Sequence, residues 1–448
     1  VRAFDASAST PGDAAITGFS WDFGDGLGAT GAAVSHTYAN TGSFVVSLTV
    51  TDALGQQSVW RTTPDTSETQ TFSTLTAATT LDAGPRHVCV IREGSPWCWG
   101  QNYGQNLGRS YGSAEVNGNN VVNGLETSGV PVQASVGISS ATAVVAGETH
   151  TCALLPNGTV RCWGSMAFSG LGDGVNTESA VPVTVSGLGT AKALTGGGDH
   201  LCALKADGTV WCWGNERLDG PGKVLGSAVP TQVSGLSTAV AVAATGSHFS
   251  TSGLYSCAVL ADGGVRCWGD ARYGKLGNGS LVNSASPVVV AGISTAVAIA
   301  TGDSSACALL ANGQVQCWGE YAGGVLGGLG VTASAGGAPV TVPGISQAVA
   351  VSMSGTHACA LLADATVACW GGAPMARGVA SPNVTSTAAP LPGLSSVAAV
   401  SVGQAYTCAL LTSGAVRCLG SGSNGVLGTG GQAVVVNGVV QNPPSYTN

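Results

Sequence analysis

The fold of this chain is decided by the stretch Cys152-Ala-Leu-Leu-Pro-Asn-Gly-Thr-Val-Arg-Cys162. Short apolar runs flank Pro156-Asn157-Gly158, which predicts two antiparallel strands joined by a three-residue loop. Such loops commonly consist of a type I turn followed by a left-handed residue, usually Gly. If Cys152 lies opposite Cys162, then Leu155 lies opposite Thr159, and a disulfide can staple the hairpin.

The same hairpin recurs along the chain, because the fourteen cysteines fall into seven pairs, the first nine residues apart and the others ten. The loop Gly recurs in most pairs, whereas Ala365 replaces it in the sixth, where we expect strain. Glu93-Gly94 suits a two-residue primed turn in the first. An even count at regular spacing predicts disulfides, and zinc is disfavoured because its sites need C-x2–4-C spacings. The predicted pairs are Cys89 with Cys98, Cys152 with Cys162, Cys202 with Cys212, Cys257 with Cys267, Cys307 with Cys317, Cys359 with Cys369, and Cys408 with Cys418.

Each hairpin belongs to a repeat of about 50 residues, since successive first cysteines lie 63, 50, 55, 50, 52 and 49 residues apart. An alternating apolar strand precedes the hairpin, which ends in Cys-Trp-Gly. A Gly-rich loop with Leu-Gly and a strand containing Pro follow it. Four short strands per repeat are typical of a propeller blade, so the sequence predicts an all-β, seven-bladed β-propeller.

The repeated order Gly-x-x-His-x-Cys-Ala-Leu, Asp/Asn-Gly-x-Val, Trp-Gly and Gly-x-Leu-Gly resembles the regulator of chromosome condensation repeat, whose members form seven-bladed propellers. Two departures stand out: Leu419 replaces Trp in the last unit, and residues 373–378 lack Leu-Gly. The founder of that family exchanges nucleotide on a small GTPase and binds chromatin. This chain is acidic, lacks a basic tail and has paired cysteines, so we carry over the fold and not the activity.

The N-terminal segment has a different pattern, with Phe4-Asp-Ala-Ser, Trp21-Asp-Phe-Gly-Asp-Gly26 and His36-Thr-Tyr38. It resembles a polycystic kidney disease (PKD) domain, an immunoglobulin-like β-sandwich common on secreted bacterial proteins. The resemblance implies that Trp21 is a core aromatic, that Asp22 and Asp25 form a turn, and that Tyr38 is a core or corner residue. A calcium role for Asp22 and Asp25 is an alternative to the turn.

These patterns predict a PKD-like sandwich over residues 1–59, a linker over 60–68, a propeller over 69–440 and a tail over 441–448. PKD domains usually begin with a Pro-containing strand that is missing before Val1. The tail segment Asn442, Pro443, Pro444, Ser445 and Tyr446 resembles that opening. One hypothesis is therefore that the tail completes the sandwich of the next copy by strand addition. The alternatives are a window cut from a longer tandem array, plain truncation and a divergent first strand.

Composition excludes several classes of protein. Charged residues make up 8% of the chain, and its net charge is −8. Nucleic acid and anionic membranes require a basic footprint, so neither is an expected partner. No apolar run reaches the ~18 residues of a membrane span.

Candidate catalytic residues are scarce. His87, His150, His200, His248 and His357 precede the first Cys of their units, with Ser305 and Tyr406 in the other two. Because they repeat with the blades, we expect them to hydrogen-bond a neighbouring blade rather than to form a catalytic set or a metal site. The Gly-rich residues 323–330 are not followed by Lys-Ser/Thr, which disfavours a phosphate site. We therefore predict no enzyme activity, catalytic residue, cofactor or metal.

The favoured interpretation is a non-catalytic extracellular structural or adhesive protein of bacterial origin, with a self-assembling surface-fibre subunit as one form of it. Expected partners are copies of itself, other surface proteins or glycans, because an exterior with few charges suits a covered protein. The alternative is a secreted binding module whose propeller face captures a protein or carbohydrate. An enzyme, such as a propeller lyase, is disfavoured because the blades are nearly equivalent.

Overall fold

The structure of this 448-residue chain is a computed structural model. It describes residues 2–5, 16–23, 27–36, 46–53, 57–62, 78–108, 119–122, 125–134, 137–165, 171–175, 177–215, 226–245, 253–320, 337–372, 385–391, 394–421, 425–428, 434–436 and 439–441. The chain divides into two compact units, Val1–Gln70 and Thr71–Asn448. Both consist of β-strands, which confirms the predicted all-β class.

The first unit contains two antiparallel sheets. One pairs β1 (Arg2–Asp5) with β4 (Ala33–His36). The other has the order β3–β2–β5–β6, formed by β3 (Gly28–Thr30), β2 (Ile16–Asp22), β5 (Val46–Asp52) and β6 (Gln57–Thr62). Because β6 runs to Thr62, the sheet takes in the first three residues of the stretch that the sequence assigns to the linker.

The core of the first unit forms around Trp21, as predicted, together with Phe23 and Leu48. The indole Nε1 of Trp21 donates to the carbonyl oxygen of Gly31 at 2.9 Å. Phe23 stacks on His36 with ring centroids 4.1 Å apart, a contact that the sequence did not reveal. Asp22 is exposed. Asp25 and Tyr38 lie outside the described residues.

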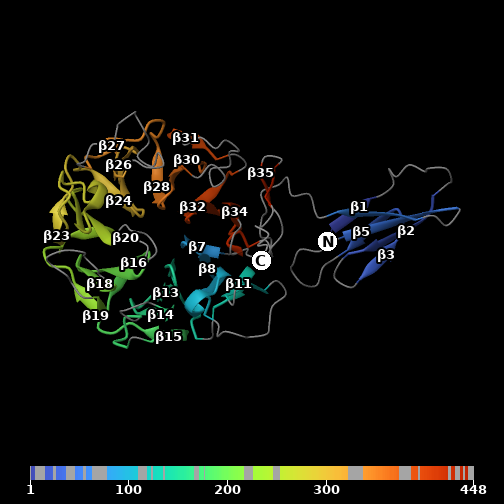
Figure 1. Ribbon diagram of the computed structural model, residues 1–448, viewed down its shortest axis with the longest axis horizontal. Helices are drawn as coiled ribbons and strands as arrows, with labels where there is room; N and C mark the ends of the chain where they lie inside the picture. Colours follow the sequence, from blue (N-terminus) through green and yellow to red (C-terminus); the bar gives the residue numbers. More distant parts are fainter. Residues whose placement is uncertain are drawn as a thin grey trace. The chain divides into compact units, whose positions relative to one another are not determined.

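The second unit is a ring of seven blades around a central axis (Figure 1). The first blade has the order β10–β11–β9–β8–β7 and contains β7 (Ala78–Ala83), β8 (His87–Arg92), β9 (Ser95–Gln101), β10 (Asn119–Val122) and β11 (Leu125–Gln133). A short 3-10 turn, η1 (Tyr103–Gln105), follows β9. The first strand of each blade lies next to the axis, where residues from these strands line one cavity.

Blades two to six each contain four strands in chain order from the axis outward. The second has β12 (Ala143–Ala146), β13 (His150–Leu154), β14 (Val160–Gly164) and β15 (Ser179–Thr184). The third has β16 (Ala191–Gly196), β17 (His200–Lys205), β18 (Val210–Gly214) and β19 (Ser227–Gln232). The fourth has β20 (Ala239–Thr245), β21 (Tyr255–Leu260), β22 (Val265–Gly269) and β23 (Ser284–Val289), with η2 (Arg272–Gly274) after β22.

The fifth blade has β24 (Ala296–Thr301), β25 (Ser305–Leu310), β26 (Val315–Gly319) and β27 (Val340–Thr341). The sixth has β28 (Ala348–Met353), β29 (His357–Leu362), β30 (Val367–Gly371) and β31 (Thr385–Pro390). In the seventh, the described strands are β32 (Val397–Val402), β33 (Tyr406–Leu411) and β34 (Val416–Gly420). A separate hairpin pairs β35 (Val434–Val436) with β36 (Val439–Gln441).

The hairpin turns have the predicted conformations. Loop glycines such as Gly158 and Gly313 adopt φ of +79°, the left-handed region that glycine tolerates without steric cost. Glu93 and Gly94 both have positive φ, 51° and 75°, which is the signature of a type I′ turn. Ala365 keeps the left-handed conformation at φ 62° despite its Cβ, so the predicted strain is confirmed.

Candidate functional site: the blade interfaces and the axial cavity

The seven predicted cysteine pairs are all present as disulfides, and the two cysteines of each pair lie directly opposite each other in their hairpin. Their Cα atoms are 4.0–4.2 Å apart, the separation of a close antiparallel pair. All fourteen cysteines are buried. The bonds join Cys89 to Cys98, Cys152 to Cys162, Cys202 to Cys212, Cys257 to Cys267, Cys307 to Cys317, Cys359 to Cys369, and Cys408 to Cys418. Each disulfide closes one hairpin within one blade, so none of them ties two blades together.

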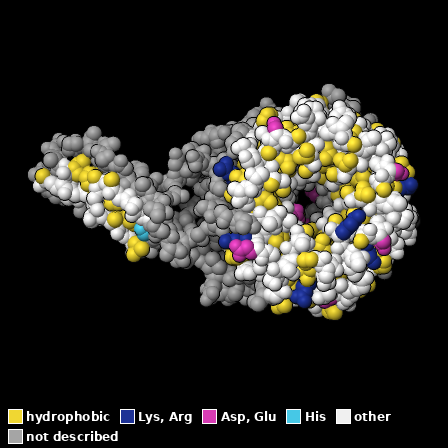
Figure 2. All heavy atoms as spheres, turned by 180° about the vertical axis from the view of Figure 1, so that it is seen from behind, with side chains coloured by type: hydrophobic (Ala, Val, Ile, Leu, Met, Phe, Trp, Pro, Cys, Tyr) yellow, Lys and Arg dark blue, Asp and Glu magenta, His cyan; other side chains and the backbone are white. Residues whose placement is uncertain are grey.

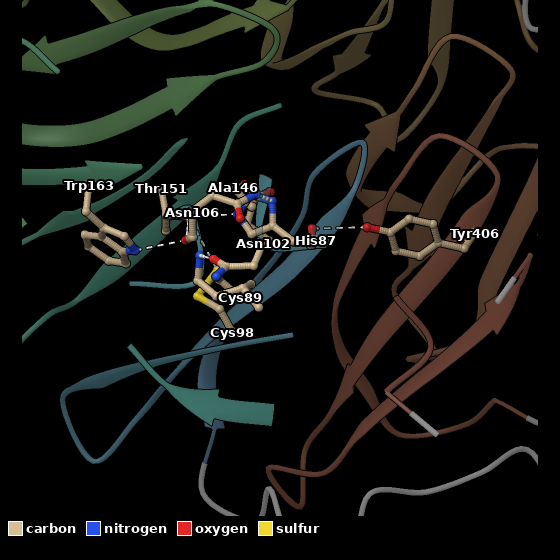
Figure 3. The surroundings of a disulfide bond; sticks show 11 residues. His87, Cys89, Cys98, Asn102, Asn106, Ala146, Thr151, Trp163 and Tyr406 are labelled. Carbon is tan, nitrogen blue, oxygen red and sulfur yellow. Dashed lines mark hydrogen bonds between the residues drawn. A yellow bond between two sulfur atoms is a disulfide. The ribbon is translucent and has the colours of Figure 1, made fainter. Parts of the chain in front are cut away.

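In five blades, a contact with the next blade is made by the side chain of the residue that precedes the first Cys by two positions. In the first blade this is His87, whose Nε2 lies 2.7 Å from Oγ1 of Thr151 in the second blade (Figure 3). Thr151 donates its own proton to the carbonyl oxygen of Asn106, so it accepts from Nε2–H. The amide Nδ2 of Asn106 lies 3.0 Å from Nδ1 of His87, which therefore accepts. His87 is thus held as the neutral tautomer with its proton on Nε2.

Two other histidines repeat this contact. His200 Nε2 lies 2.9 Å from Ser256 Oγ, and His357 Nε2 lies 2.8 Å from Thr407 Oγ1. Each hydroxyl belongs to the residue just before the first Cys of the next blade. The predicted hydrogen bond to a neighbouring blade is therefore confirmed for His87, His200 and His357.

In two blades a tyrosine, rather than a histidine, makes the hydrogen bond to the next blade. Tyr406 donates to the carbonyl oxygen of Gly84 at 2.6 Å, which joins the last blade to the first. Tyr255 donates to the carbonyl oxygen of Gly302 at 3.0 Å. Tyr255 pairs with Gly269 as His87 pairs with Gly100, so it occupies the His position of the fourth blade. The assignment of that position to His248 was wrong, because the fourth unit carries extra residues before Tyr255; His248 itself lies outside the described residues.

His150 is the exception among the described histidines. Its ring is fully buried, and neither nitrogen has a hydrogen-bond partner within the described part of the chain. The next blade carries Leu201 where the first interface has Thr151, so the hydroxyl is missing. The predicted inter-blade hydrogen bond is therefore wrong for His150.

Burial suppresses protonation of these rings. Loss of solvation, followed by the nearby ring of His150, lowers the pKa of His87 from 6.5 to about 3. The pKa of His150 is lowered to about 3 by burial and by His200, and that of His200 to about 4 by burial. Such neutral, buried imidazoles, of which His87 and His200 are also hydrogen-bonded in place, are structural groups rather than proton-transfer groups.

A second set of contacts explains the Trp-Gly and Leu-Gly motifs. The indole Nε1 of Trp163 donates to the carbonyl oxygen of Asn106 at 2.9 Å, and that of Trp318 to Lys275 at 3.0 Å. Trp99 donates in the same way to Val426 at 2.8 Å. Each acceptor immediately precedes Leu-Gly in the preceding blade of the ring. In these three blades the Trp is therefore hydrogen-bonded to the Leu-Gly loop of the preceding blade, and the bond of Trp99 joins the last blade to the first. The indole Nε1 of Trp213 has no such partner in the described part of the chain.

The axis contains a cavity of about 220 Å³ lined by the innermost strands and the loops that follow them. Its wall includes the carboxylates of Asp82 and Asp303. Figure 2 shows acidic side chains inside the central opening and few charged groups on the surrounding face. The described cavity wall contains no Lys or Arg, so its charge is negative.

Asp82 links three blades at this wall. Its Oδ2 accepts from the backbone N–H of Ala146 at 2.7 Å, and its Oδ1 accepts from Ser401 Oγ at 3.3 Å. Burial raises the pKa of Asp82 to about 6, although these hydrogen bonds oppose the shift. Thr195 and Ser352 make the same bond to the next blade from the equivalent position. These bonds from the inner strands to the next blade were not predicted from the sequence. The pattern that could have predicted them is a polar residue that recurs within an otherwise apolar strand.

A buried ion pair occupies the loop after β22. Lys275 Nζ lies 2.7 Å from Asp270 Oδ2, and both side chains are at most 1% exposed. Lys275 also donates to the carbonyl oxygen of Gly253 at 2.7 Å, and Arg272 lies 2.9 Å from the other oxygen of Asp270. Burial lowers the pKa of Lys275, and Asp270 opposes this shift. Sequence analysis missed the pair, which braces the loop that carries Arg272 and Tyr273.

The remaining expectations concern metals, membranes and assembly. In the described ranges, no three His, Cys, Asp or Glu side chains are grouped so that they could hold a metal ion. No helix found there is long and apolar enough to cross a membrane. The assembly segment Asn442, Pro443, Pro444, Ser445 and Tyr446 lies outside the described residues, as do residues 323–330.

Comparison with known proteins agrees with both units. Residues 1–66 match the model of the PKD domain. Residues 141–169 and 191–217 match one model of the regulator of chromosome condensation (RCC1) repeat, and residues 262–309 match another. No protein of curated function matches the chain significantly in sequence.

Solved structures share the propeller fold. Prp20p from Saccharomyces cerevisiae aligns with a TM-score of 0.62 and 18% identity over 82% of this chain and 87% of its own. Human WBSCR16 aligns with a TM-score of 0.59 and 18% identity over 91% of this chain and 99% of its own. At these identities the similarity establishes the fold alone.

The disulfides and the PKD domain indicate an extracellular module, because disulfides persist in oxidising compartments. The chain therefore contains a PKD domain followed by a seven-bladed propeller that includes RCC1 repeats.

Proposed function

We propose that this protein is a non-catalytic extracellular structural or adhesive module. The observation that carries the proposal is that its recurrent polar side chains are used to join blades. Described residues of the types that usually perform catalysis, such as His87, Tyr255 and Asp82, are hydrogen-bonded across an interface; the first two are buried and Asp82 is partly buried. A ring whose blades are each stapled internally by a disulfide is suited to presenting surface.

In its self-assembling form, the protein is a surface-fibre subunit whose tail completes the PKD sandwich of the next copy. Head-to-tail addition of this kind does not close on itself and therefore generates filaments. The test is light scattering coupled to size exclusion on the non-reduced chain, with and without residues 442–448. Polymers that disappear on truncation support the fibre form, whereas a monomer of 43.8 kDa for the full chain contradicts it.

A second candidate is a binding module, favoured by the loop after β22. Tyr273 is 46% exposed and has φ 62°, a conformation that side chains rarely adopt. Arg272 is next to it, and the exposed residues Leu281 and Val282 end the same loop. An aromatic ring beside a guanidinium on a braced loop is suited to stacking on a sugar ring and bonding its hydroxyl or carboxylate groups.

Pull-down on insoluble cellulose, chitin and pectin tests this second candidate. Retention by one polymer that is lost in Tyr273→Ala supports a carbohydrate site on the fourth blade. Val181→Ala, which alters an exposed side chain on β15, provides the matched control. Equal behaviour of both variants on all three polymers contradicts the carbohydrate site.

A further inference from the structure

The same backbone hydrogen bond joins every neighbouring pair of blades. The residue at the start of an inner strand, or two positions before it in the case of Ala141, donates its N–H to the carbonyl oxygen of the left-handed residue in the preceding hairpin turn. The donors and their acceptors are Ala141 to Gly94, Ala191 to Gly158, Ala239 to Gly208, Ala296 to Gly263, Ala348 to Gly313, Val397 to Ala365, and Ala78 to Gly414. The seven interfaces can therefore be compared position by position.

The interface between the sixth and seventh blades departs from this pattern at its turn. A Cβ added to Gly313 would lie 2.8 Å from the carbonyl oxygen of Ser346, so a regular turn has no room for a side chain. Ala365 places a Cβ at this position. The facing residue Ser396 has φ 57°, whereas the equivalent residues Thr238 and Gln347 do not have positive φ. Two left-handed non-glycine residues thus meet across one interface.

The same interface also lacks the hydrogen bond between a Trp indole and the residue before Leu-Gly. At three other interfaces the Trp of one blade donates to the residue before Leu-Gly in the preceding blade, as Trp318 does to Lys275. At the interface between the second and third blades, Trp213 keeps its place but its indole Nε1 has no hydrogen-bond partner in the described part of the chain. Leu419 occupies the Trp position of the seventh blade, and residues 373–378 of the sixth contain no Leu-Gly. The missing Trp and the missing Leu-Gly, which look unrelated in the sequence, are therefore the donor side and the acceptor side of one absent hydrogen bond.

The other side of the seventh blade is regular. Trp99 donates to Val426, Tyr406 donates to Gly84, and Ala83 donates to Ser401 Oγ at 2.8 Å. Between the sixth and seventh blades, the bonds that remain include His357 to Thr407 and Val402 to Ser352. Because every disulfide lies within a blade, all seven interfaces lack a covalent cross-link of this kind.

We propose that the ring is built to open between its sixth and seventh blades, with the seventh blade remaining docked on the first. Opening at this interface separates the strand pair β32–β33 from β28–β29. It exposes an apolar surface that includes Leu361, Leu391 and Leu419. The fold thus contains a designated point of opening that leaves all seven disulfides intact.

Native-state hydrogen exchange of the full oxidised chain, resolved by peptide, tests the proposal. The expected result is faster exchange in the peptide that spans the start of β32 than in those that span the starts of β24, β28 and β7. The β7 peptide is the essential control because it reports on the other interface of the same seventh blade. Equal exchange at the two interfaces of the seventh blade overturns the proposal, since it indicates fraying of a terminal blade.

A repair variant provides the second arm. Ala365→Gly removes the backbone strain of the left-handed Ala in the turn. We therefore expect hydrogen exchange at the start of β32 to slow about tenfold. Gly414→Ala, in the turn that faces the first blade, is the matched variant and should accelerate exchange at β7 instead. An Ala365→Gly variant whose exchange at β32 is unchanged also overturns the proposal.

Discussion

His87 Nε2 lies 2.7 Å from Thr151 Oγ1, and this contact crosses from the first blade to the second. The pair shows how the propeller uses its repeated polar residues. Each blade is closed internally by a disulfide hairpin, and hydrogen bonds that His, Tyr and Trp side chains donate and that Asp82 accepts then join blades to one another. The interfaces, rather than the cysteines, determine how stable the ring is.

Replacing His87 with Phe should destabilise the protein by about 1–3 kcal/mol, because Thr151 and Asn106 each lose a buried partner. His150→Phe is the matched control, since the His150 ring makes no hydrogen bond within the described structure. Urea unfolding of the oxidised chain measures both variants. A His150 variant as destabilised as the His87 variant would show that burial of the ring, and not its hydrogen bonds, is what matters.

Stability should fall as the pH is lowered from about 6.5 to 4. Burial lowers the pKa of His87, His150 and His200 to about 3, 3 and 4, so unfolding takes up three protons in this range. Asp82, with its pKa raised to about 6, already holds one proton in the folded state and so offsets one. Between about pH 6 and 4, these four groups give a net uptake of two protons, or about 3 kcal/mol per pH unit, and the raised pKa of Asp303 lessens this slope. Urea midpoints that rise on acidification would contradict this assignment.

The hydrogen bond from the Trp318 indole to Lys275 predicts that Trp318→Leu lowers the stability of the protein strongly. This variant places in the fifth blade the residue that the seventh blade has at position 419. Trp318 is fully buried and donates to Lys275, so we expect a loss of about 2–4 kcal/mol. Trp211→Leu is the control, because that side chain is only partly buried and bonds within its own hairpin to Thr209. Thermal unfolding of the two variants should rank Trp318→Leu as clearly the less stable.

The buried ion pair predicts non-additive effects. Lys275→Met should cost about 3–5 kcal/mol, because it leaves the Asp270 carboxylate buried with only the partly exposed Arg272 beside it. The double variant Lys275→Met, Asp270→Asn should recover much of that loss. Denaturant unfolding of the three chains completes the cycle, and strictly additive losses would mean that the two charges do not interact.

The sequence determined the hairpins because their signals are local. Cysteine spacing, loop length and the turn Gly predicted the register of Cys152 with Cys162 and the strain at Ala365. Contacts between blades depend on residues about 50 positions apart, so spacing alone placed His87 correctly but misplaced the fourth position at His248. It also gave no partner for Asp82 or Lys275, whose roles exist only once the ring has closed and removed them from water.

Peptide mapping of the non-reduced protein, isolated from the cells that make it, tests the central claim most directly. The account predicts that all fourteen cysteines resist alkylation until they are reduced, and that they map to seven pairs, each within one hairpin. Free thiols throughout the native protein would place it in a reducing compartment and contradict an extracellular module.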